Sequence, residues 1–316
     1  MISVLDAFIA TLSPMLVMFS CIVIGFVLNK RKALPDNTST VLSKLENSVL
    51  VPSLIINTFM SYCTVASLKQ QYKMMLYCVI AAIVAIALAY LLSGFFEKEE
   101  YKKNIYRYAL AIGNFGFMGN AIVPAILGQE FLYDYLLFTL PLNIAVYTWG
   151  ITILIPKTGE KKSPIQNLCN PFMLATLLGI FLGLTNADSY MPSFFHTTVS
   201  NLSACMGPVA MVLTGFVIGD YDVVGLLKNK KVYVATFLRL IVLPVFFIGF
   251  LMILGADPKT LTLALFAFGT PLGLNTVVFP AAYGGDTSTG ASMAMISHTL
   301  CIITIPLLYV ILTSII

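Results

Sequence analysis

The chain has 316 residues, of which 59% are hydrophobic and 10% are charged, with a formal net charge of +4. Soluble domains carry about 25% charged residues, so this composition excludes a soluble protein and predicts an all-α polytopic membrane protein. The six cysteines are scattered through apolar runs without a Cys-x-x-Cys pair, which predicts neither a disulfide framework nor a metal site.

A membrane-spanning helix needs roughly 20 apolar residues. The first apolar run has no basic segment before it and continues past Val27, so it predicts a spanning helix rather than a cleaved signal. In all, we predict about ten spans, at residues 6–28, 38–62, 73–96, 106–128, 131–155, 168–186, 196–219, 232–254, 260–284 and 288–315.

Lysine and arginine alternate between the two sides of these spans. Thirteen of the 18 follow spans one, three, five and seven, whereas the opposite connections hold only Lys69, Lys73 and Lys259. Because basic residues favour the cytoplasmic side, we expect both termini outside and a multi-pass protein in the plasma (inner) membrane.

A shift of 156 residues aligns the two halves of the chain. It places Pro52 on Pro208, Ala111 on Ala267, and Pro124 on Pro280. A repeat of five helices must enter the membrane from the opposite side the second time, so we predict a 5+5 inverted repeat, common in secondary transporters. The expected units are residues 1–155, a short cytoplasmic link at 156–169, and residues 170–316.

Two stretches within the spans, residues 111–124 and 267–280, are rich in residues that weaken helices. Glycine costs about 1 kcal/mol and proline about 3 kcal/mol in a helix interior. Non-helical backbone at membrane depth is tolerated where it lines a cavity, and paired interruptions point to a transporter's binding site. We expect the breaks in spans four and nine to be formed by Gly113, Gly116, Gly119, Pro124, Gly269, Pro271, Gly273 and Pro280.

A broken helix exposes N–H groups and a positive dipole end of roughly half a charge, which suits a carboxylate. Uncharged amides add donors that can release the anion again. The substrate-binding candidates are Asn114, Asn120, Asn275, Thr276, Asn57 and Ser53, with Asn143 and Tyr147 as further polar candidates. The alternative is that these side chains only join helices or cap broken backbone.

Ionisable residues inside the spans are further candidates. His298 is suited to proton coupling because imidazole titrates near neutrality, although a lone histidine also serves as a packing residue. Glu46 and Asp134 are expected near the cytoplasmic interface and at the outer start of span five. Arg239 lies deeper and requires a partner, which we expect to be structural.

Three motifs resemble the auxin efflux carrier family: Val49 to Ile55, Gly113 to Gly119, and Pro271 to Val278 followed by Tyr283-Gly284-Gly285-Asp286. The resemblance covers nearly the whole chain and extends to the bacterial branch of malate and malonate permeases. It implies broken, crossing helices four and nine, as in sodium–proton antiporters and bile-acid transporters, with scaffold and transport subdomains and a homodimer. Relatives place a proline near Ala121 and Thr276, whereas here Pro124 and Pro280 come later.

The sequence therefore predicts a secondary carrier or efflux carrier that moves a small organic carboxylate, auxin-like or malate/malonate-like, by alternating, elevator-type access. We expect proton or sodium coupling, contacts with membrane lipid, and no cofactor, nucleic-acid partner or enzymatic activity. A sensor or channel of the same fold that binds an organic anion is the alternative.

Overall fold

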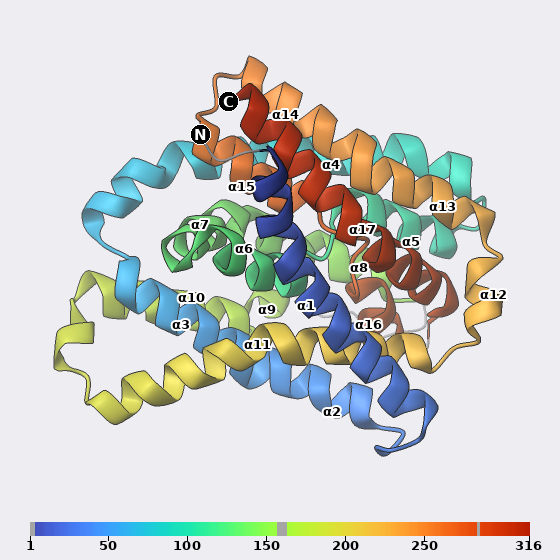
Figure 1. Cartoon of the computed structure of the whole chain (residues 1–316), viewed down its shortest axis with the longest axis horizontal. Coiled ribbons are helices and arrows are strands. Elements are labelled where there is room, and N and C mark those ends of the chain that lie inside the picture. The colour runs from blue at the N-terminus through green and yellow to red at the C-terminus, as the bar shows by residue number, and fades with distance from the viewer. Residues whose placement is uncertain (1–3, 157–162, 283–284) are drawn as a thin grey trace.

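The computed structural model describes residues 4–156, 163–282 and 285–316, and Figure 1 shows them as a bundle of helices. Over these residues the chain forms helices and one isolated β-bridge, without a β-strand. The elements are α1 (Val4–Lys30), α2 (Thr38–Leu45), η1 (Glu46–Leu50), α3 (Val51–Tyr62), α4 (Val65–Phe96), α5 (Glu100–Ala111), η2 (Phe115–Gly119), α6 (Asn120–Leu127), α7 (Gln129–Ala145), η3 (Val146–Gly150), α8 (Ile151–Leu154), α9 (Pro164–Leu168), α10 (Pro171–Leu184), η4 (Ala187–Tyr190), α11 (Ser193–Gly219), α12 (Val223–Leu227), α13 (Lys230–Phe237), η5 (Leu238–Val242), α14 (Leu243–Ile253), α15 (Pro258–Phe268), α16 (Asn275–Ala282) and α17 (Ser288–Ile315).

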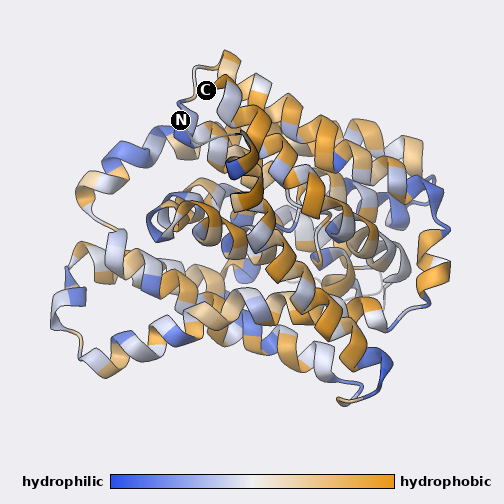
Figure 2. Ribbon diagram, viewed as in Figure 1, coloured by the Kyte–Doolittle hydropathy of each residue, from blue (hydrophilic) through white to orange (hydrophobic). Residues whose placement is uncertain are grey.

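Six helical segments of the described chain are long and apolar enough to cross a membrane, and three shorter apolar helices accompany them. Apolar residues cover the outer surfaces of several long helices, as Figure 2 shows for α14 and α17. Side chains such as Leu91, Phe95 and Ile253 are exposed there, where lipid replaces water as the solvent. The predicted polytopic, all-α membrane fold is confirmed.

Each predicted span coincides with one helix or one interrupted helix. The third begins earlier than predicted, at Val65, because Thr64 and Ser67 form a reciprocal cap: the Thr64 hydroxyl accepts from the Ser67 N–H at 3.0 Å, and the Ser67 hydroxyl from the Thr64 N–H at 2.9 Å. Such a cap starts a helix among polar residues, which an apolar-run criterion misses. Tyr283 and Gly284, part of one family-like motif, lie outside the described residues, as do residues 157–162 of the predicted link.

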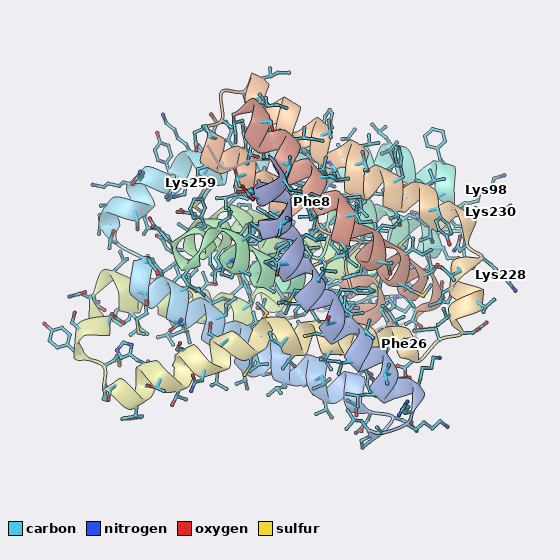
Figure 3. All side chains as sticks on the ribbon, viewed as in Figure 1. Phe8, Phe26, Lys98, Lys228, Lys230 and Lys259 are labelled. Atoms are coloured by element: carbon cyan, nitrogen blue, oxygen red, sulfur yellow. The ribbon has the colours of Figure 1, made fainter. Side chains whose placement is uncertain are left out.

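Lysines at the helix ends separate along the long axis of the molecule. Figure 3 shows Lys98, Lys228 and Lys230 at one end and Lys259 toward the other. At the basic end, Lys231 pairs with Glu97 at 3.2 Å, and the hydrogen bonds from Lys98 and Lys231 lower the pKa of the Glu97 carboxyl. This arrangement matches the predicted alternation of basic residues between the two sides of the spans.

Spans four and nine are both broken, and the two breaks run side by side. The fourth span stops at Ala111 and resumes at Phe115, and the ninth stops at Phe268 and resumes at Asn275. Gly113 and Leu272 form an antiparallel bridge, and the Asn114 N–H donates to the Pro271 carbonyl at 2.7 Å. Antiparallel passage is the geometry expected of two segments that enter the membrane from opposite sides.

The prediction that Pro124 and Pro280 lie in the breaks is wrong. Pro124 and Pro280 lie inside α6 and α16, beyond the breaks. Each lacks an N–H, but the Pro124 carbonyl still accepts from the Gly128 N–H at 3.1 Å and the Pro280 carbonyl from the Gly285 N–H at 2.8 Å. Gly113, Gly269, Pro271 and Gly273 lie in the interruptions instead, whereas Gly116 and Gly119 lie in the restarted turn η2.

Glu46, predicted near the cytoplasmic interface, is enclosed by protein. Glu46 is fully buried, at 0% exposure, in the π-helical turn η1, whereas Lys44 is exposed as expected. The extra residue that a π-helical turn inserts rotates the following side chains around the helix axis. Glu46 itself begins this turn and faces the interior, where η1 packs against α11 and α10.

Candidate functional site

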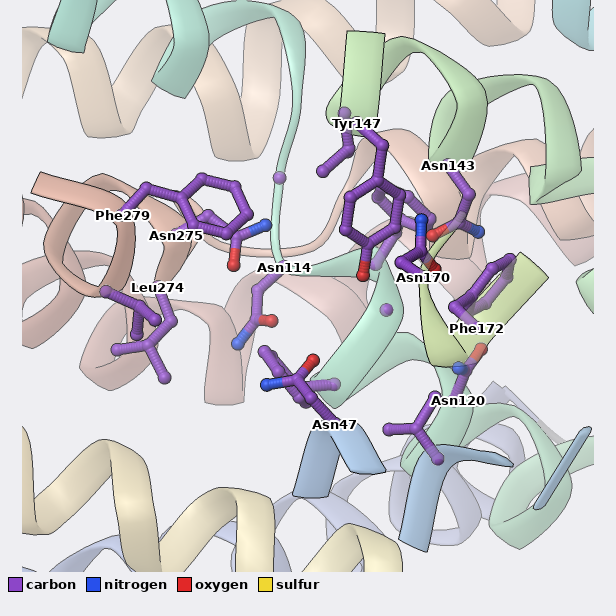
Figure 4. A pocket seen from close by; sticks show the side chains of 18 of the residues that line it. Asn47, Asn114, Asn120, Asn143, Tyr147, Asn170, Phe172, Leu274, Asn275 and Phe279 are labelled. Atoms are coloured by element: carbon purple, nitrogen blue, oxygen red, sulfur yellow. The ribbon is translucent and has the colours of Figure 1, made fainter. Parts of the chain in front are cut away.

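A cavity of about 190 Å³ lies beside the crossing of the two breaks. Polar amides and aromatic rings from five parts of the chain surround it, as Figure 4 shows. Its lining residues are Asn47, Val51, Gly113, Asn114, Phe115, Gly116, Phe117, Asn120, Asn143, Val146, Tyr147, Asn170, Pro171, Phe172, Gly273, Leu274, Asn275, Val278 and Phe279.

Both restarted helices begin at this cavity. Gly116 and Phe117 line it from the first turn of the segment 115–127, and Leu274 and Asn275 line it where α16 begins. The first N–H groups of a helix have no partner within the helix and carry its positive dipole end. Two positive helix ends therefore converge on one cavity, an arrangement that favours an anion.

The opposite, negative helix ends converge on Arg239. Its guanidinium donates to the carbonyls of Leu110 at 3.2 Å, Ala111 at 3.4 Å, Ala267 at 3.4 Å and Thr270 at 3.3 Å. These carbonyls belong to the last turns of α5 and α15 and to the second break, and Arg239 is 1% exposed. One buried cation thus stabilises both negative ends, which is the structural role expected for it.

Gly113 lets the guanidinium reach those carbonyls. A Cβ atom on Gly113 would lie against the Arg239 guanidinium and 2.8 Å from the Thr270 carbonyl oxygen. Gly273 is close to the other break, with a Cβ position 3.3 Å from the Ile112 carbonyl oxygen. Glycine at residue 113 is therefore required by the close approach of the two breaks.

The three central asparagines have different partners. Asn114 bonds through Nδ2 to His298 Nε2 at 2.9 Å, and Asn275 Nδ2 donates to the Tyr108 hydroxyl at 2.8 Å. The Oδ1 atom of Asn120 is buried and has no hydrogen-bond partner among the described residues. An unpaired buried acceptor costs about 1–3 kcal/mol, so Asn120 is a strong candidate to bind a ligand or water.

A second cavity of about 450 Å³ lies on the other side of Asn120, between α3, α6 and α11. Asn120 lines both cavities, while Asn57 lines only the second. Hydroxyl and amide groups dominate its polar lining, which comprises Asn57, Thr58, Ser61, Tyr62, Asn120, Gln129, Ser200 and Ser203. Asn120 is thus shared by the two cavities.

The family model described as membrane transport protein matches the chain twice, over residues 10–165 and 158–309. The chain belongs to this family, which is that of the auxin efflux carriers. No curated protein matches the sequence significantly. The boundary between the two matches, at residues 158–165, falls within the predicted link between the two five-helix repeats.

Four further predicted site residues of this transporter line neither cavity as described. Thr276 is fully buried and its hydroxyl donates to the Gly273 carbonyl at 2.8 Å, which holds the second break in shape. Ser53 is 9% exposed and lies outside both cavities as described. Gly119 packs against the Tyr135 hydroxyl, and Gly269 follows the last turn of α15.

The three predicted coupling residues differ in how they are paired. Asp134 pairs with Lys259 and accepts from Gln71 Nε2 at 2.5 Å, near the end of the transporter that carries Lys259. Both carboxyl oxygens of Glu46 are buried without a hydrogen-bond partner in the described part of the chain. His298 adjoins the site through Asn114. Among the described residues, no group of three or more His, Cys, Asp or Glu could hold a metal ion.

The sequence did not single out two amides and two aromatic rings of the transporter's cavity. Asn170 carried a usable signal, because Asn-Pro is typical of a helix start: its side chain accepts from the Met173 N–H at 3.1 Å. Asn47 carried none, because the π-helical turn η1 sets its direction. The rings of Phe172 and Phe279 lie in apolar helices where nothing distinguishes them from packing residues.

Proposed function

We propose that this transporter is a secondary carrier that moves a small organic carboxylate across the plasma membrane by alternating access. One observation carries the proposal: two helix N-termini and the amides of Asn114 and Asn275 face one cavity, while Arg239 neutralises the matching C-termini. The helix ends place partial positive charge at the cavity, and the lining amides add polar groups without net charge. Such a site binds an anion and can release it.

The lining also favours one kind of carboxylate. Phe117, Tyr147, Phe172 and Phe279 contribute aromatic rings, and no Lys, Arg or His is among the described lining residues. One carboxylate can use the helix ends, whereas a second would meet apolar surface. We therefore favour a monocarboxylate with an apolar or aromatic body, auxin-like in chemistry, over a malate- or malonate-like dicarboxylate.

The two cavities suggest a route for the ligand through the protein. With both termini outside, Asn170 and Asn47 lie toward the cytoplasmic ends of their spans, whereas Tyr62 and Gln129 lie toward the outer ends. The first cavity then opens inward and the second outward. Because Asn120 lines both, a movement that shifts the barrier around it would transfer the ligand between them.

The driving force in this proposal is a proton or sodium gradient. Asp134 is paired with Lys259 away from the cavity, so we assign coupling to the inner groups, His298 and Glu46. Scaffold and transport subdomains and a homodimer complete the proposal as the family resemblance implies them.

Alanine at Asn114 or at Asn275 is expected to weaken carboxylate binding by about tenfold to a hundredfold in Kd. The reason is that a hydrogen bond to a charged group contributes about 1.5–3 kcal/mol. Isothermal titration of the purified transporter with indole-3-acetate and, separately, malonate measures the effect. Asn201→Ala is the matched control, because Asn201 is exposed on α11 and lines neither described cavity. Unchanged affinity in both site variants would refute this site.

A further inference from the structure

The side chain of Asn114 stands between the cavity and His298. Asn114 lines the cavity and is 3% exposed, while His298 is 1% exposed and lies behind it on α17. The two side chains are joined at 2.9 Å between Asn114 Nδ2 and His298 Nε2. The other ring nitrogen, Nδ1, lies 2.7 Å from the Ala294 carbonyl oxygen. Both ring nitrogens therefore have a hydrogen-bond partner.

These partners fix the positions of the hydrogens. A carbonyl oxygen only accepts, so His298 Nδ1 must carry the hydrogen that it donates to Ala294. In the neutral ring Nε2 is then an acceptor, and the Asn114 amide donates to it. The amide oxygen of Asn114 is left on the cavity side, as Figure 4 shows. In this state Asn114 offers an acceptor, which repels a carboxylate.

A proton on His298 reverses this arrangement. Protonated Nε2 is a donor, and a donor cannot bond to the amide NH₂. If the Asn114 amide turns over, its oxygen accepts from Nε2–H and its NH₂ faces the cavity, where it can donate to a carboxylate. The imidazolium charge also lies one side chain away from the bound anion.

We infer that His298 is the proton site of the carrier and that its protonation switches Asn114 from acceptor to donor, so that one proton is taken up with each carboxylate. This inference rests on the proposed function. The loaded site then holds one positive and one negative charge. Reorientation of the loaded carrier would move no net charge through these two groups, and the ligand would travel with a proton.

The surroundings of His298 contain no ion-pair partner for the ring among the described residues. Arg239 of η5, which packs against α17, is a buried cation that four carbonyls already hold. Cys301 of α17 donates its thiol to the His298 carbonyl at 3.1 Å, and Tyr108 of α5 is bonded to Asn275. Other titratable groups on α17 and on the helices packed against it are Tyr309 of α17, Asp6, Cys21 and Lys30 of α1, Glu100, Tyr101, Lys102, Lys103, Tyr106 and Arg107 of α5, His196 and Cys205 of α11, Lys230, Lys231 and Tyr233 of α13, and Lys259 of α15.

The test is proton uptake on ligand binding, measured by titrating indole-3-acetate into the transporter in buffers of different ionisation enthalpy. At a pH where the free ring is neutral, the wild-type protein is expected to take up about one proton per anion bound. In His298→Gln the uptake is expected to disappear and the Kd to become independent of pH, because glutamine can turn to suit either amide orientation but binds no proton. His196→Gln, which replaces a histidine that is paired with Asp188 and lines neither described cavity, is expected to behave as wild type.

Uptake that persists in His298→Gln overturns the inference, and its loss in Glu46→Gln instead would assign the proton to Glu46. If indole-3-acetate and malonate bind to no form of the protein, the proposed function fails separately. The inference can then still be tested without a ligand. In the His196→Gln protein His298 is the one remaining histidine, and nitrogen-15 NMR shows which of its ring nitrogens carries hydrogen. The inference requires hydrogen on Nδ1 at high pH, and hydrogen on Nε2 alone would contradict it.

Discussion

Replacing Arg239 with leucine is expected to lower the free energy of unfolding by about 3 kcal/mol or more. Four carbonyls lose their shared donor, and each buried acceptor left without a partner costs about 1–3 kcal/mol. The negative ends of α5 and α15 would also face each other without a cation between them. Thermal unfolding in detergent, with the yield of monodisperse protein, measures the loss.

Two further variants test which property of Arg239 stabilises the protein. Arg239→Lys keeps the charge but replaces a planar, five-donor group with a single nitrogen, so an intermediate loss is expected. Arg31→Leu removes an exposed arginine at the end of α1 and is expected to change stability by less than about 1 kcal/mol. Wild-type stability in Arg239→Leu would show that the guanidinium does not hold the crossing together.

Alanine at Gly113 is expected to abolish carboxylate binding while leaving much of the bundle folded. The added Cβ would lie 2.8 Å from the Thr270 carbonyl oxygen and against the guanidinium of Arg239. The two breaks would have to separate, which displaces Asn114 and its bond to Pro271. We expect at least a hundredfold rise in Kd, equivalent to about 2.8 kcal/mol, by the same calorimetric titration.

Gly94→Ala is the control for Gly113→Ala. Gly94 lies within α4 with open space around its Cβ position, so alanine there is expected to leave binding unchanged and to favour the helix slightly. Gly113→Ala protein with wild-type affinity would mean that the spacing of the two breaks does not set the site.

The sequence was sufficient to predict the broken helices and their central amides. Gly113 and Asn114 interrupt one apolar run and Pro271 and Gly273 another, and the 156-residue shift relates the two. Local chemistry decides such features, because glycine, asparagine and proline weaken a helix wherever they occur. The same reasoning placed Pro124 and Pro280 in the breaks wrongly, since a proline within a restarted helix removes one hydrogen bond without ending the helix.

Features that depend on contacts between distant segments were beyond the sequence. Asn114 and His298 are 184 residues apart, and the carbonyls that Arg239 binds lie up to 129 residues away. The π-helical turn η1 begins at Glu46 and changes the direction of the side chains that follow, and no residue pattern marked that turn. A three-dimensional arrangement is needed to convert such polar residues from isolated candidates into one site.

Flux tests the central claim, transport of a small carboxylate, more directly than binding does. The purified protein would be reconstituted into liposomes and the uptake of radiolabelled indole-3-acetate measured, with malonate as a second substrate. We expect saturable uptake that an inwardly directed proton gradient accelerates, and that Asn114→Ala and Asn275→Ala reduce at least tenfold. Binding without flux in the wild-type protein would identify a sensor, and uptake equal to that of empty liposomes for both acids would contradict the account.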